Sequence, residues 1–257
     1  TLRERGFVVL DPEVGRLTGN DVGPGRFPET ATIISAFDQV TGQLQDLKGT
    51  KVLITAGGTR EAIDPVRFIG NKSSGKQGIA LANAAKNRGA DVTLIAANCE
   101  TSHLKDMKVV SVESTEQMQK ALNSHFEECN ILIMSAAVAD ARPVQRSDEK
   151  IKKASLLNLE LEPNPDLLAE LAPRKGGRIM VGFAAETRDH LQEARRKLES
   201  KGLDVIYVND VSGGAIFGQD TTMGTILIRN EADIAVKEVS KDALSNTLLD
   251  QAIRQLG

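Results

Sequence analysis

Apolar runs and amphipathic segments alternate along the chain from residue 51 onward. Five short runs have the length and composition of strands, at residues 52–55, 91–95, 131–134, 179–183 and 204–208. Several of the segments between them carry apolar residues at every third or fourth position, which predicts helices. Because continuous apolar strands are buried on both faces, the alternation predicts a doubly wound, mostly parallel, Rossmann-like α/β sheet with helices on both faces.

The C-terminal part follows a different pattern. Residues 225–228 and 232–236 are apolar runs that flank Asn230, and together they predict a β-hairpin. Residues 244–256 place leucine or alanine at every fourth position, which predicts a last amphipathic helix. The expected fold is therefore α/β with a C-terminal hairpin.

Glycine and proline punctuate the first 29 residues, where only residues 7–10 predict a strand. Residues 31–47 carry apolar side chains at helical spacing, and Gly49 ends this predicted helix. The strand–helix alternation begins directly after this break. The sequence therefore predicts a linker with a connecting helix over residues 1–49 and an α/β domain over residues 50–257.

Residues 141–161 interrupt the alternation, because they are polar and basic and lack clear periodicity. A long irregular segment inside an α/β domain is usually a functional lid or a disordered insertion. Lys150, Lys152 and Lys153 lie in this segment and have two interpretations. They form either a solvated face or a mobile flap that supplies positive charge to an anionic ligand.

Composition narrows the classes of function. The net charge of −3 gives no basic excess for binding nucleic acid, and no apolar run approaches the ~20 residues that span a membrane. Cys99 and Cys129 lack CxxC or Cys/His spacing, which argues against a structural zinc site. Both are predicted to be small apolar residues in or near strands, and the default compartment is the cytoplasm.

In doubly wound sheets, ligands bind beyond the carboxyl ends of the strands. Gly57, Gly58 and Thr59 follow the first predicted strand. Paired glycines there either let the backbone approach a phosphate closely or form an ordinary tight turn. The pattern is neither GxGxxG nor a Walker A motif. A dinucleotide-binding site and a P-loop site are therefore both less favoured.

Ser73, Ser74 and Gly75 lie at the predicted start of the next helix. The unpaired N–H groups and the dipole of a helix start attract anions. Lys72 and Lys76 add positive charge at the same place. The alternative is a serine N-cap beside two solvated lysines.

Further polar and small residues lie near other predicted ends. Arg67 can bind a phosphate or carboxylate through two hydrogen bonds, and Asn71 offers a donor and an acceptor without charge. Ser135 and Ala136 follow the third strand and leave room for a bulky ligand. Asp140 is predicted to accept from a ribose hydroxyl, to help hold Mg²⁺, or to cap a helix.

Three later segments complete the set of candidates. Residues 164–167 predict a turn that opens a helix, with proline at a first helical position. Phe183 either stacks on a base or packs in the core. Lys197 and Lys201 are four residues apart on one predicted helix face, so that they either point toward one place or are both solvated.

From Lys51 to the C-terminus the chain resembles the bacterial phosphopantothenoylcysteine synthetase domain. The resemblance rests on ordered segments, which are KVLITAGGTREAIDPVRFIGNKSSGKQG, SAAVAD, KIKK, PNPD, VGFAAET and the lysine pair before LDVIYVND. Residues 96–99 depart from the family, which usually has glycine and proline there. Residues 4–29, especially GRLTGNDVGPGRFPE, resemble the tail of the phosphopantothenoylcysteine decarboxylase fused upstream in bifunctional proteins. The flavin-binding body of that decarboxylase is not in this sequence, so no flavin is expected.

The resemblance implies a ligase of coenzyme A biosynthesis that works in two steps. The carboxylate of 4′-phosphopantothenate attacks the α-phosphorus of CTP in the presence of Mg²⁺, which gives an acyl-cytidylate and pyrophosphate. The amine of L-cysteine then attacks the acyl group and releases CMP. The resemblance also implies a homodimer, in which a flap or substrate-binding residues reach the partner's active site.

It also implies roles for single residues. Asn71 matches the asparagine that turns over the acyl-cytidylate, and Arg67 matches its nearby arginine. Lys150 opens the KIKK flap motif, with Lys152 and Lys153, and matches the lysine of the first step. The nucleotide-site positions are residues 57–59 and 73–76, Lys150, Met134, Ser135, Ala136, Asp140, Asn164, Pro165, Asp166, Leu167, Phe183, Lys197 and Lys201.

Three alternative functions remain open. An NADPH-dependent reductase on the same sheet would carry GxGxxG and a Tyr-xxx-Lys pair, but Tyr207, the one tyrosine, lies inside a predicted strand. A non-catalytic nucleotide sensor would release no pyrophosphate. An ATP-using form of the ligase, as in eukaryotic relatives, would differ only in its nucleotide.

Overall fold

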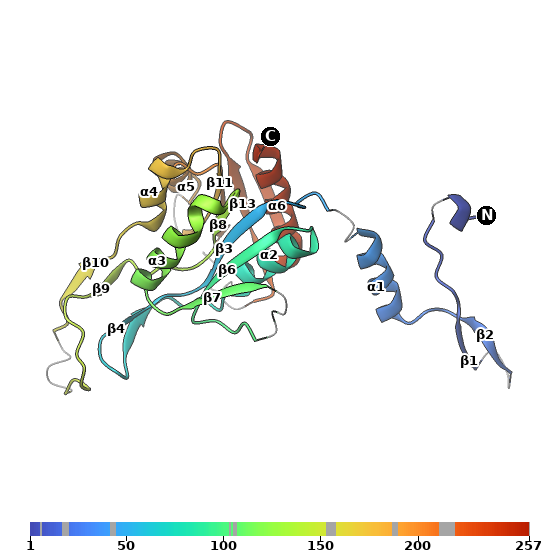
Figure 1. The fold of residues 1–257 in the computed structure, drawn as a ribbon, viewed down its shortest axis with the longest axis horizontal. Helices are drawn as coiled ribbons and strands as arrows, with labels where there is room; N and C mark the ends of the chain where they lie inside the picture. Colours follow the sequence, from blue (N-terminus) through green and yellow to red (C-terminus); the bar gives the residue numbers. More distant parts are fainter. Residues whose placement is uncertain are drawn as a thin grey trace. The chain divides into compact units, whose positions relative to one another are not determined.

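The computed structural model describes most of the chain as two compact units, Thr1–Asp46 and Leu47–Gly257. The described residues are 1–5, 7–16, 21–41, 45–102, 104, 107–152, 158–186, 190–210 and 219–256. The boundary between the units lies close to the predicted one after residue 49. Figure 1 shows the elements of both units.

In its described residues, the first unit contains a short 3-10 helix, two strands and one α-helix. They are η1 (Arg3–Arg5), β1 (Glu13–Arg16), β2 (Val22–Arg26) and α1 (Thr30–Thr41). The prediction of a strand at residues 7–10 is wrong. A strand needs a pairing partner, and β1 and β2 pair with each other instead of with these residues. Phe7 and Val8 are exposed. The predicted helix is present, but Leu47 lies in a turn and is buried in the second unit rather than on α1.

An eight-stranded sheet with the order β14-β13-β12-β11-β8-β3-β6-β7 forms the centre of the second unit. The strands are β3 (Lys51–Gly57), β6 (Asp91–Ala97), β7 (Lys108–Val112), β8 (Ile131–Met134), β11 (Ile179–Glu186), β12 (Val205–Asp210), β13 (Thr221–Ile228) and β14 (Ile234–Ser240). All pairs from β12 to β7 are parallel, whereas β13 and β14 pair antiparallel. The predicted doubly wound α/β fold is confirmed.

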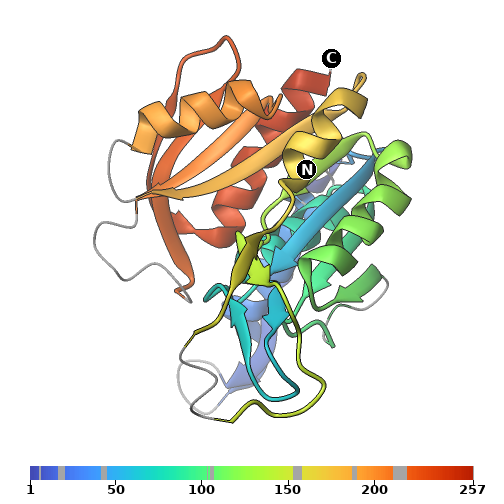
Figure 2. The ribbon, with the colours of Figure 1, turned by 90° about the vertical axis from the view of Figure 1, so that its left-hand side faces the viewer.

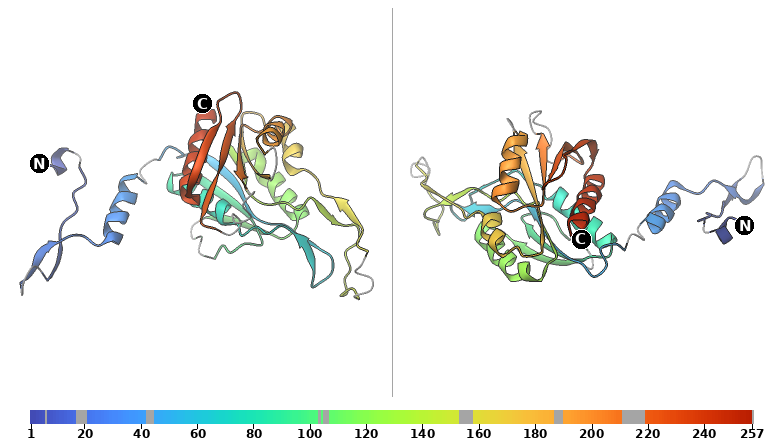
Figure 3. Two further views of the ribbon diagram at one scale, coloured as in Figure 1. Left: turned by 180° about the vertical axis from the view of Figure 1, so that it is seen from behind. Right: turned by 90° about the horizontal axis from the view of Figure 1, so that it is seen from above.

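The C-terminal hairpin is also present, and Figure 3 shows it beside the last helix. Asn230 lies between its strands with a φ of 61°, a left-handed conformation that asparagine tolerates. Strand β7 was not predicted. It is an edge strand whose side chains are mostly half-buried or exposed, so it lacks a continuous buried run.

Helices cover both faces of the sheet, as Figure 2 shows. They are α2 (Lys76–Asn87), α3 (Thr115–His125), α4 (Leu167–Leu171), α5 (His190–Ser200) and α6 (Lys241–Leu256), with short 3-10 turns η2 (Phe126–Glu128) and η4 (Ala172–Arg174). Leu81 of α2 and Leu248 of α6 belong to one apolar core. Met118 of α3 and Leu198 of α5 belong to the other. The alternation along β3 serves both cores, because Val52 faces the first and Leu53 the second.

Two antiparallel ribbons extend beyond the sheet at one end, and they lie beside each other in Figure 2. They are β4 (Arg60–Ala62) with β5 (Phe68–Gly70), and β9 (Ala141–Pro143) with β10 (Leu161–Pro163). The segment 141–161 is therefore not irregular throughout. Arg142 and Glu162 face each other across β9 and β10 and form an ion pair of 2.7 Å, which stabilises the ribbon.

Both cysteines lie beside strands of the sheet, as predicted. Cys99 follows β6 and is half-buried, and Cys129 precedes β8 and is buried. Burial raises the pKa of the Cys99 thiol and raises that of Cys129 to about 11. Both thiols are therefore protonated and unreactive near neutral pH.

Helix α2 packs on β3 at van der Waals contact through Gly78. A Cβ at residue 78 would lie 2.5 Å from Ala56 Cβ and 2.8 Å from Thr55 O. Both obstacles belong to the central strand and cannot rotate away. This contact fixes the position of the α2 start relative to the end of β3.

Gly78→Ala is therefore expected to destabilise the second unit by roughly 1–3 kcal/mol, because the added methyl group forces α2 off the sheet. Urea unfolding followed by circular dichroism measures the change. Gly177→Ala is the matched control, since a Cβ there meets no atom within 4 Å. Equal stabilities of the two variants would contradict this account of the contact.

Candidate functional site

Two adjoining pockets lie at the carboxyl ends of β8 and β11. The α2/α6 pocket, about 210 Å³, lies at the starts of α2 and α6, and the α4/α5 pocket, about 360 Å³, lies against α4 and α5. Residues 136–137 and 183–185 line both, so the pockets adjoin at these strand ends. Strand order changes direction between β3 and β8, and doubly wound sheets bind ligands at such a point.

The α4/α5 pocket gathers residues from four separate segments of the chain. Of the predicted nucleotide-site residues, those that line it are Met134, Ala136, Asp140, Asn164, Pro165, Asp166, Leu167, Phe183, Lys197 and Lys201. The prediction that the two lysines point toward one place is supported, because both reach this pocket. Lys201 Nζ lies 2.9 Å from Asp166 Oδ2.

Asp166 is the N-cap of α4, and its Oδ1 accepts a hydrogen bond of 3.1 Å from the N–H of Ala169. Burial acts to raise the pKa of Asp166, but Lys201 and backbone donors outweigh it and hold the pKa below its usual range. Pro165 therefore precedes the cap and is not the first helical residue, which corrects the expectation from sequence. Asp140 caps no helix either, since β9 follows it, and its side chain is exposed.

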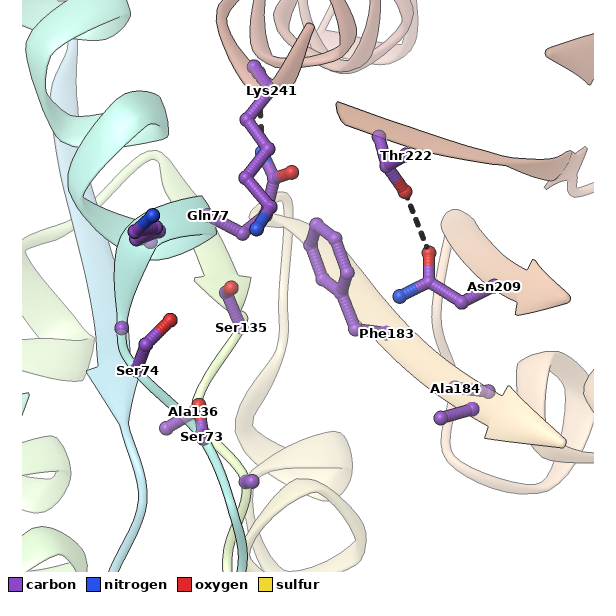
Figure 4. Close-up of a pocket in the computed structure, with 15 residues that line it drawn as sticks. Ser73, Ser74, Gln77, Ser135, Ala136, Phe183, Ala184, Asn209, Thr222 and Lys241 are labelled. Carbon is purple, nitrogen blue, oxygen red and sulfur yellow. Dashed lines mark hydrogen bonds between the residues drawn. The ribbon is translucent and has the colours of Figure 1, made fainter. Parts of the chain in front are cut away.

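The α2/α6 pocket contains the predicted anion-binding residues Ser73, Ser74, Gly75 and Lys76, together with Ser135, Ala136 and Phe183. Figure 4 shows the labelled side chains around it. The alternative of a serine N-cap is wrong: Gly75 is the N-cap of α2, with a φ of 77° and no side-chain hydrogen bond. No serine hydroxyl therefore competes with a ligand for the N–H groups at the start of α2.

Four residues with polar side chains in the α2/α6 pocket were not predicted: Gln77, Asn209, Thr222 and Lys241. Asn209 lies near the carboxyl end of β12 and follows the same rule that found the other candidates, so the sequence offered a signal for it. Thr222 and Lys241 come from the hairpin and from the start of α6. Their arrival at this edge depends on the antiparallel pairing of β13 and β14.

Phe183 lies at the junction of the two pockets (Figure 4). Its ring packs edge to face against Tyr207, with centroids 5.7 Å apart. It is half-buried, so it contacts the core and keeps a surface toward the pockets. The two predicted roles of this residue are therefore compatible.

Gly57, Gly58 and Thr59 make a tight turn that contacts neighbouring loops rather than lining either pocket. Gly57 has a φ of 83°, and a Cβ there would lie 1.9 Å from Ala97 O. The N–H of Thr59 donates to Ala137 O over 3.2 Å. As nucleotide-binding residues these three stay predictions, and what the structure shows is that they position Ala137.

Residues 96–99, where the sequence departs from the family, stabilise the same turn. Asn98 has a φ of 50°, and its Nδ2 donates to Gly58 O and to Glu113 O, both over 2.9 Å. Cys99 packs against Gly57 and Gly75, where side chains would collide with it. This loop therefore holds the end of β3 and the start of α2 together.

A buried hydrogen-bond network fixes the walls of the α4/α5 pocket. Glu61 is 5% exposed, and its Oε1 accepts from Thr115 N at 2.9 Å and Thr115 Oγ1 at 2.7 Å. Thr59 Oγ1 lies 3.2 Å from Thr115 Oγ1 and accepts from Ala139 N at 2.9 Å. Asn164 Nδ2 donates to Ala139 O at 2.8 Å. The loop after β8 and the turn before α4 are thereby joined.

Arg67 and Ile151, the residue after Lys150, contact a second buried carboxylate. Asp64 is 2% exposed and accepts from the N–H groups of Val66, Arg67 and Ile151 at 2.8–3.2 Å. Arg67 Nη1 donates to Asp64 Oδ2 over 3.0 Å and to Ile151 O over 3.2 Å. Arg67 therefore ties the β4–β5 turn to the residue after Lys150.

Asn71, Lys150 and Lys152 are exposed and line neither pocket. Asn71 lies beside the α4/α5 pocket, since its Nδ2 donates over 3.1 Å to Val138 O, a residue of that pocket. Lys153 lies outside the described residues. The catalytic and flap roles of these residues stay predictions.

Residues 47–256 match the DNA/pantothenate metabolism flavoprotein C-terminal domain family. The chain belongs to this family. The family resemblance predicted from the ordered motifs is thus confirmed.

Proteins related to this chain match nearly its whole length. The coenzyme A biosynthesis bifunctional protein CoaBC of Mycobacterium tuberculosis is 44% identical over 98% of this chain and 65% of its own length. That of Bacillus subtilis is 40% identical over 97% of this chain and 63% of its own. The chain therefore spans less than two thirds of these relatives. A crystal structure of a CoaBC C-terminal domain superposes with a TM-score of 0.72 at 33% identity, covering 82% of this chain and 98% of that one.

Among the described residues, no three or more His, Cys, Asp or Glu side chains are grouped to hold a metal ion. No helix in the described part of the chain is long and apolar enough to cross a bilayer.

The buried Asp64 predicts a pH dependence of stability in this domain. Burial acts to raise the pKa of Asp64, but the backbone donors and Arg67 outweigh it and hold the pKa below 3.8. A carboxyl with a lowered folded pKa stabilises fully above its unfolded pKa, and this contribution is lost as pH falls through the folded value. Asp64→Asn should therefore destabilise the domain near neutral pH, with the difference from the wild type shrinking below about pH 4.

Urea unfolding at several pH values between about 2.5 and 7 measures this difference. The matched control is Asp148→Asn, because Asp148 is an exposed carboxylate in the loop after β9. A difference between Asp64→Asn and the wild type that stays constant down to the lowest pH would show that the ionised carboxylate contributes nothing.

Proposed function

We propose that this chain is a phosphopantothenate–cysteine ligase that uses CTP. One observation carries the proposal: ten of the eleven positions from residue 134 onward that match nucleotide-site residues of the family, Lys150 aside, line the α4/α5 pocket. The eleventh, Ser135, lines the adjoining α2/α6 pocket. These positions come from distant parts of the chain, so their convergence supports a common ligand. The name of the CoaBC relatives, a coenzyme A biosynthesis protein, agrees with this function.

The two pockets divide the nucleotide between them. The nucleoside occupies the α4/α5 pocket, where Phe183 contacts the base. The phosphates pass over the small residue Ala136 toward the start of α2, which carries Lys76 and the N–H groups that an α-helix leaves without an intrahelical partner. The helix dipole, the lysines and the N–H groups offset the negative charge of the triphosphate.

The reaction requires little covalent chemistry from the protein. A carboxylate oxygen of 4′-phosphopantothenate bonds to the α-phosphorus of CTP, and the bond to the β-phosphate oxygen breaks, so that pyrophosphate leaves. The neutral amine of cysteine then bonds to the acyl carbon, loses a proton, and CMP leaves. The protein has to position three anionic reactants and neutralise their charge.

The residues present fit the Mg²⁺ that a triphosphate brings. Magnesium is usually held by one or two carboxylates together with substrate phosphates and water. Asp140 is an exposed carboxylate that lines the α4/α5 pocket, whereas Asp166 there is paired with Lys201. Asp140 would therefore hold the ion, which neutralises phosphate charge when bound.

The proposal assigns separate roles to the flap and to the loop before α2. The role of Lys150 is inferred from the family motif. This lysine approaches the triphosphate in the first step, with Lys152 beside it. Arg67 anchors this segment through Asp64 and Ile151. Asn71, next to Val138, contacts the acyl-cytidylate in the second step.

Homodimerisation belongs to the same proposal. The two ribbons beyond the sheet expose the large apolar side chains Val66, Phe68, Val144 and Leu161. Exposed apolar side chains that cluster on one part of a molecule are typical of subunit interfaces.

The upstream decarboxylase domain in the full-length protein is likewise inferred from residues 4–29.

The proposed function is tested by the nucleotide requirement of product formation. Purified protein with 4′-phosphopantothenate, L-cysteine, Mg²⁺ and CTP should form phosphopantothenoylcysteine, CMP and pyrophosphate, measured by mass spectrometry. Without cysteine, only the acyl-cytidylate and pyrophosphate should form. Product with ATP but none with CTP would show that the ligase uses ATP instead. The absence of product with either nucleotide would overturn the proposal.

Asn71→Asp should slow the second step, because an added negative charge beside the acyl-cytidylate disfavours attack by the amine. The acyl-cytidylate should accumulate while product formation falls by roughly 100-fold or more. Rapid quench with mass spectrometry detects both species.

Lys150→Gln is the contrasting variant, since it removes the charge proposed for the first step. It should abolish the acyl-cytidylate itself and leave none to accumulate. Normal product formation by Asn71→Asp without intermediate, or normal intermediate formation by Lys150→Gln, would contradict the division of roles.

A further inference from the structure

Asp64 joins two segments that lie far apart in the sequence. It belongs to the turn between β4 and β5, and its side chain is fully buried. Its Oδ1 accepts from the N–H groups of Val66 and Arg67 at 2.9 and 2.8 Å, within the turn. Its Oδ2 accepts from Arg67 Nη1 at 3.0 Å and from Ile151 N at 3.2 Å. One oxygen therefore shapes the turn, and the other holds the segment that carries Lys150.

This segment, residues 147–152, is held by the β4–β5 turn on both sides of Lys150, and we call it the Lys150 segment. Before the lysine, Ser147 N donates over 3.0 Å to Ile63 O. After it, the backbone of Ile151 is bound twice, through its N–H to the buried carboxylate and through its carbonyl to the guanidinium over 3.2 Å. The turn therefore sets the position of the lysine's backbone.

The contact to Ile151 depends on the carboxylate more than the contacts within the turn do. All the partners of Asp64 are N–H donors, and an ionised carboxylate accepts at both oxygens, whereas an amide of the same shape has one acceptor and one donor. In Asp64→Asn one side must therefore face N–H donors with another donor. The turn donors are two and three residues away, but Ile151 is 87 residues away and has the longest of these bonds. The bond to Ile151 is therefore the one that is lost.

We propose that Asp64 is a positioning residue for the first step, because it holds the Lys150 segment where the lysine can reach the triphosphate. The inference rests on the proposed function, which assigns Lys150 to that step. Asp64 lines neither pocket and contacts no ligand in this account. Its effect is to reduce the conformations that the segment samples before the reaction, and a correctly placed charged group accelerates a reaction far more than a wandering one.

Proteolysis of the folded protein tests the contact independently of activity. Trypsin cleaves after Lys150 and Lys152 when the segment opens locally, so the cleavage rate reports the population of the open form. Asp64→Asn should raise the rate at these two lysines by roughly tenfold, and the rates at other sites by less. Mass spectrometry of the fragments identifies each site. Equal cleavage of the wild type and Asp64→Asn at Lys150 and Lys152 would overturn the proposal.

Rapid quench without cysteine measures the first step itself. Asp64→Asn should form the acyl-cytidylate roughly 10- to 100-fold more slowly than the wild type. Its affinity for CMP, measured by calorimetry, should stay within about twofold, because CMP lacks the β- and γ-phosphates that Lys150 approaches. A normal rate of acyl-cytidylate formation would overturn the proposal. A slow rate together with an equally weakened affinity for CMP would show a general distortion of the site and would also overturn it.

Asp204→Asn is the matched control for the loss of a buried carboxylate. Asp204 is 8% exposed, pairs with Lys175 and accepts from Met180 N, just before the amino end of β12 and away from the Lys150 segment. Asp204→Asn should lower stability in urea but leave cleavage at Lys150 and the rate of the first step within about twofold of the wild type. Losses in the first step that are equal in Asp204→Asn and Asp64→Asn would assign the effect to stability and overturn the positioning role.

Failure of this inference is distinguishable from failure of the ligase function. Wild-type protein that forms product while Asp64→Asn matches it in both assays would refute the positioning role alone. Wild-type protein that forms no acyl-cytidylate would refute the ligase function, and with it the role of Asp64 in the first step. Faster cleavage of Asp64→Asn at Lys150 would in that case still support the contact with the segment.

Discussion

The buried carboxylate of Glu61 constrains how the segments around the α4/α5 pocket meet. A charge taken out of water is tolerated only with hydrogen-bond partners, and Thr115 supplies two at the start of α3. Thr115 in turn contacts Thr59, and Thr59 holds Ala139 of the loop after β8. Asn164 closes the network from the turn before α4. Four segments, at residues 59–61, 115, 139 and 164, are fixed together before any ligand arrives, which is the preorganisation that positioning chemistry requires.

The site also separates two physical tasks. The α4/α5 pocket offers carboxylates, small side chains and the ring of Phe183, which suit a nucleoside. The α2/α6 pocket offers ammonium groups and the start of α2, which suit phosphate. Their junction at Ala136 and Ala137, at the end of β8, lies beside the point where the strand order of the sheet changes direction. The proposed acyl transfer without a covalent enzyme intermediate fits this arrangement, because it requires charge neutralisation and orientation rather than a nucleophile.

Sequence predicted the parts of this molecule whose signals are local. The five buried strands were recognisable because central parallel strands are continuously apolar, and the residues after them were found by the rule that ligands bind at carboxyl ends. The rest depends on pairing over long distances. Residues 7–10 look like a strand but lack a partner, the half-exposed β7 lacks an apolar run, and Lys241 reaches the pocket only because the antiparallel hairpin returns the chain there. The capping by Gly75 needed its φ of 77°, which no spacing reveals.

The central claim is that a carboxylate is activated by bonding to the α-phosphorus of CTP. It is tested most directly with 4′-phosphopantothenate that carries ¹⁸O in its carboxylate, in a complete reaction analysed by mass spectrometry. Attack on the α-phosphorus transfers one carboxylate oxygen to the nucleotide, so the account predicts one ¹⁸O in the released CMP and none in pyrophosphate. Unlabelled CDP together with ¹⁸O in inorganic phosphate would show activation at the γ-phosphate and contradict the account.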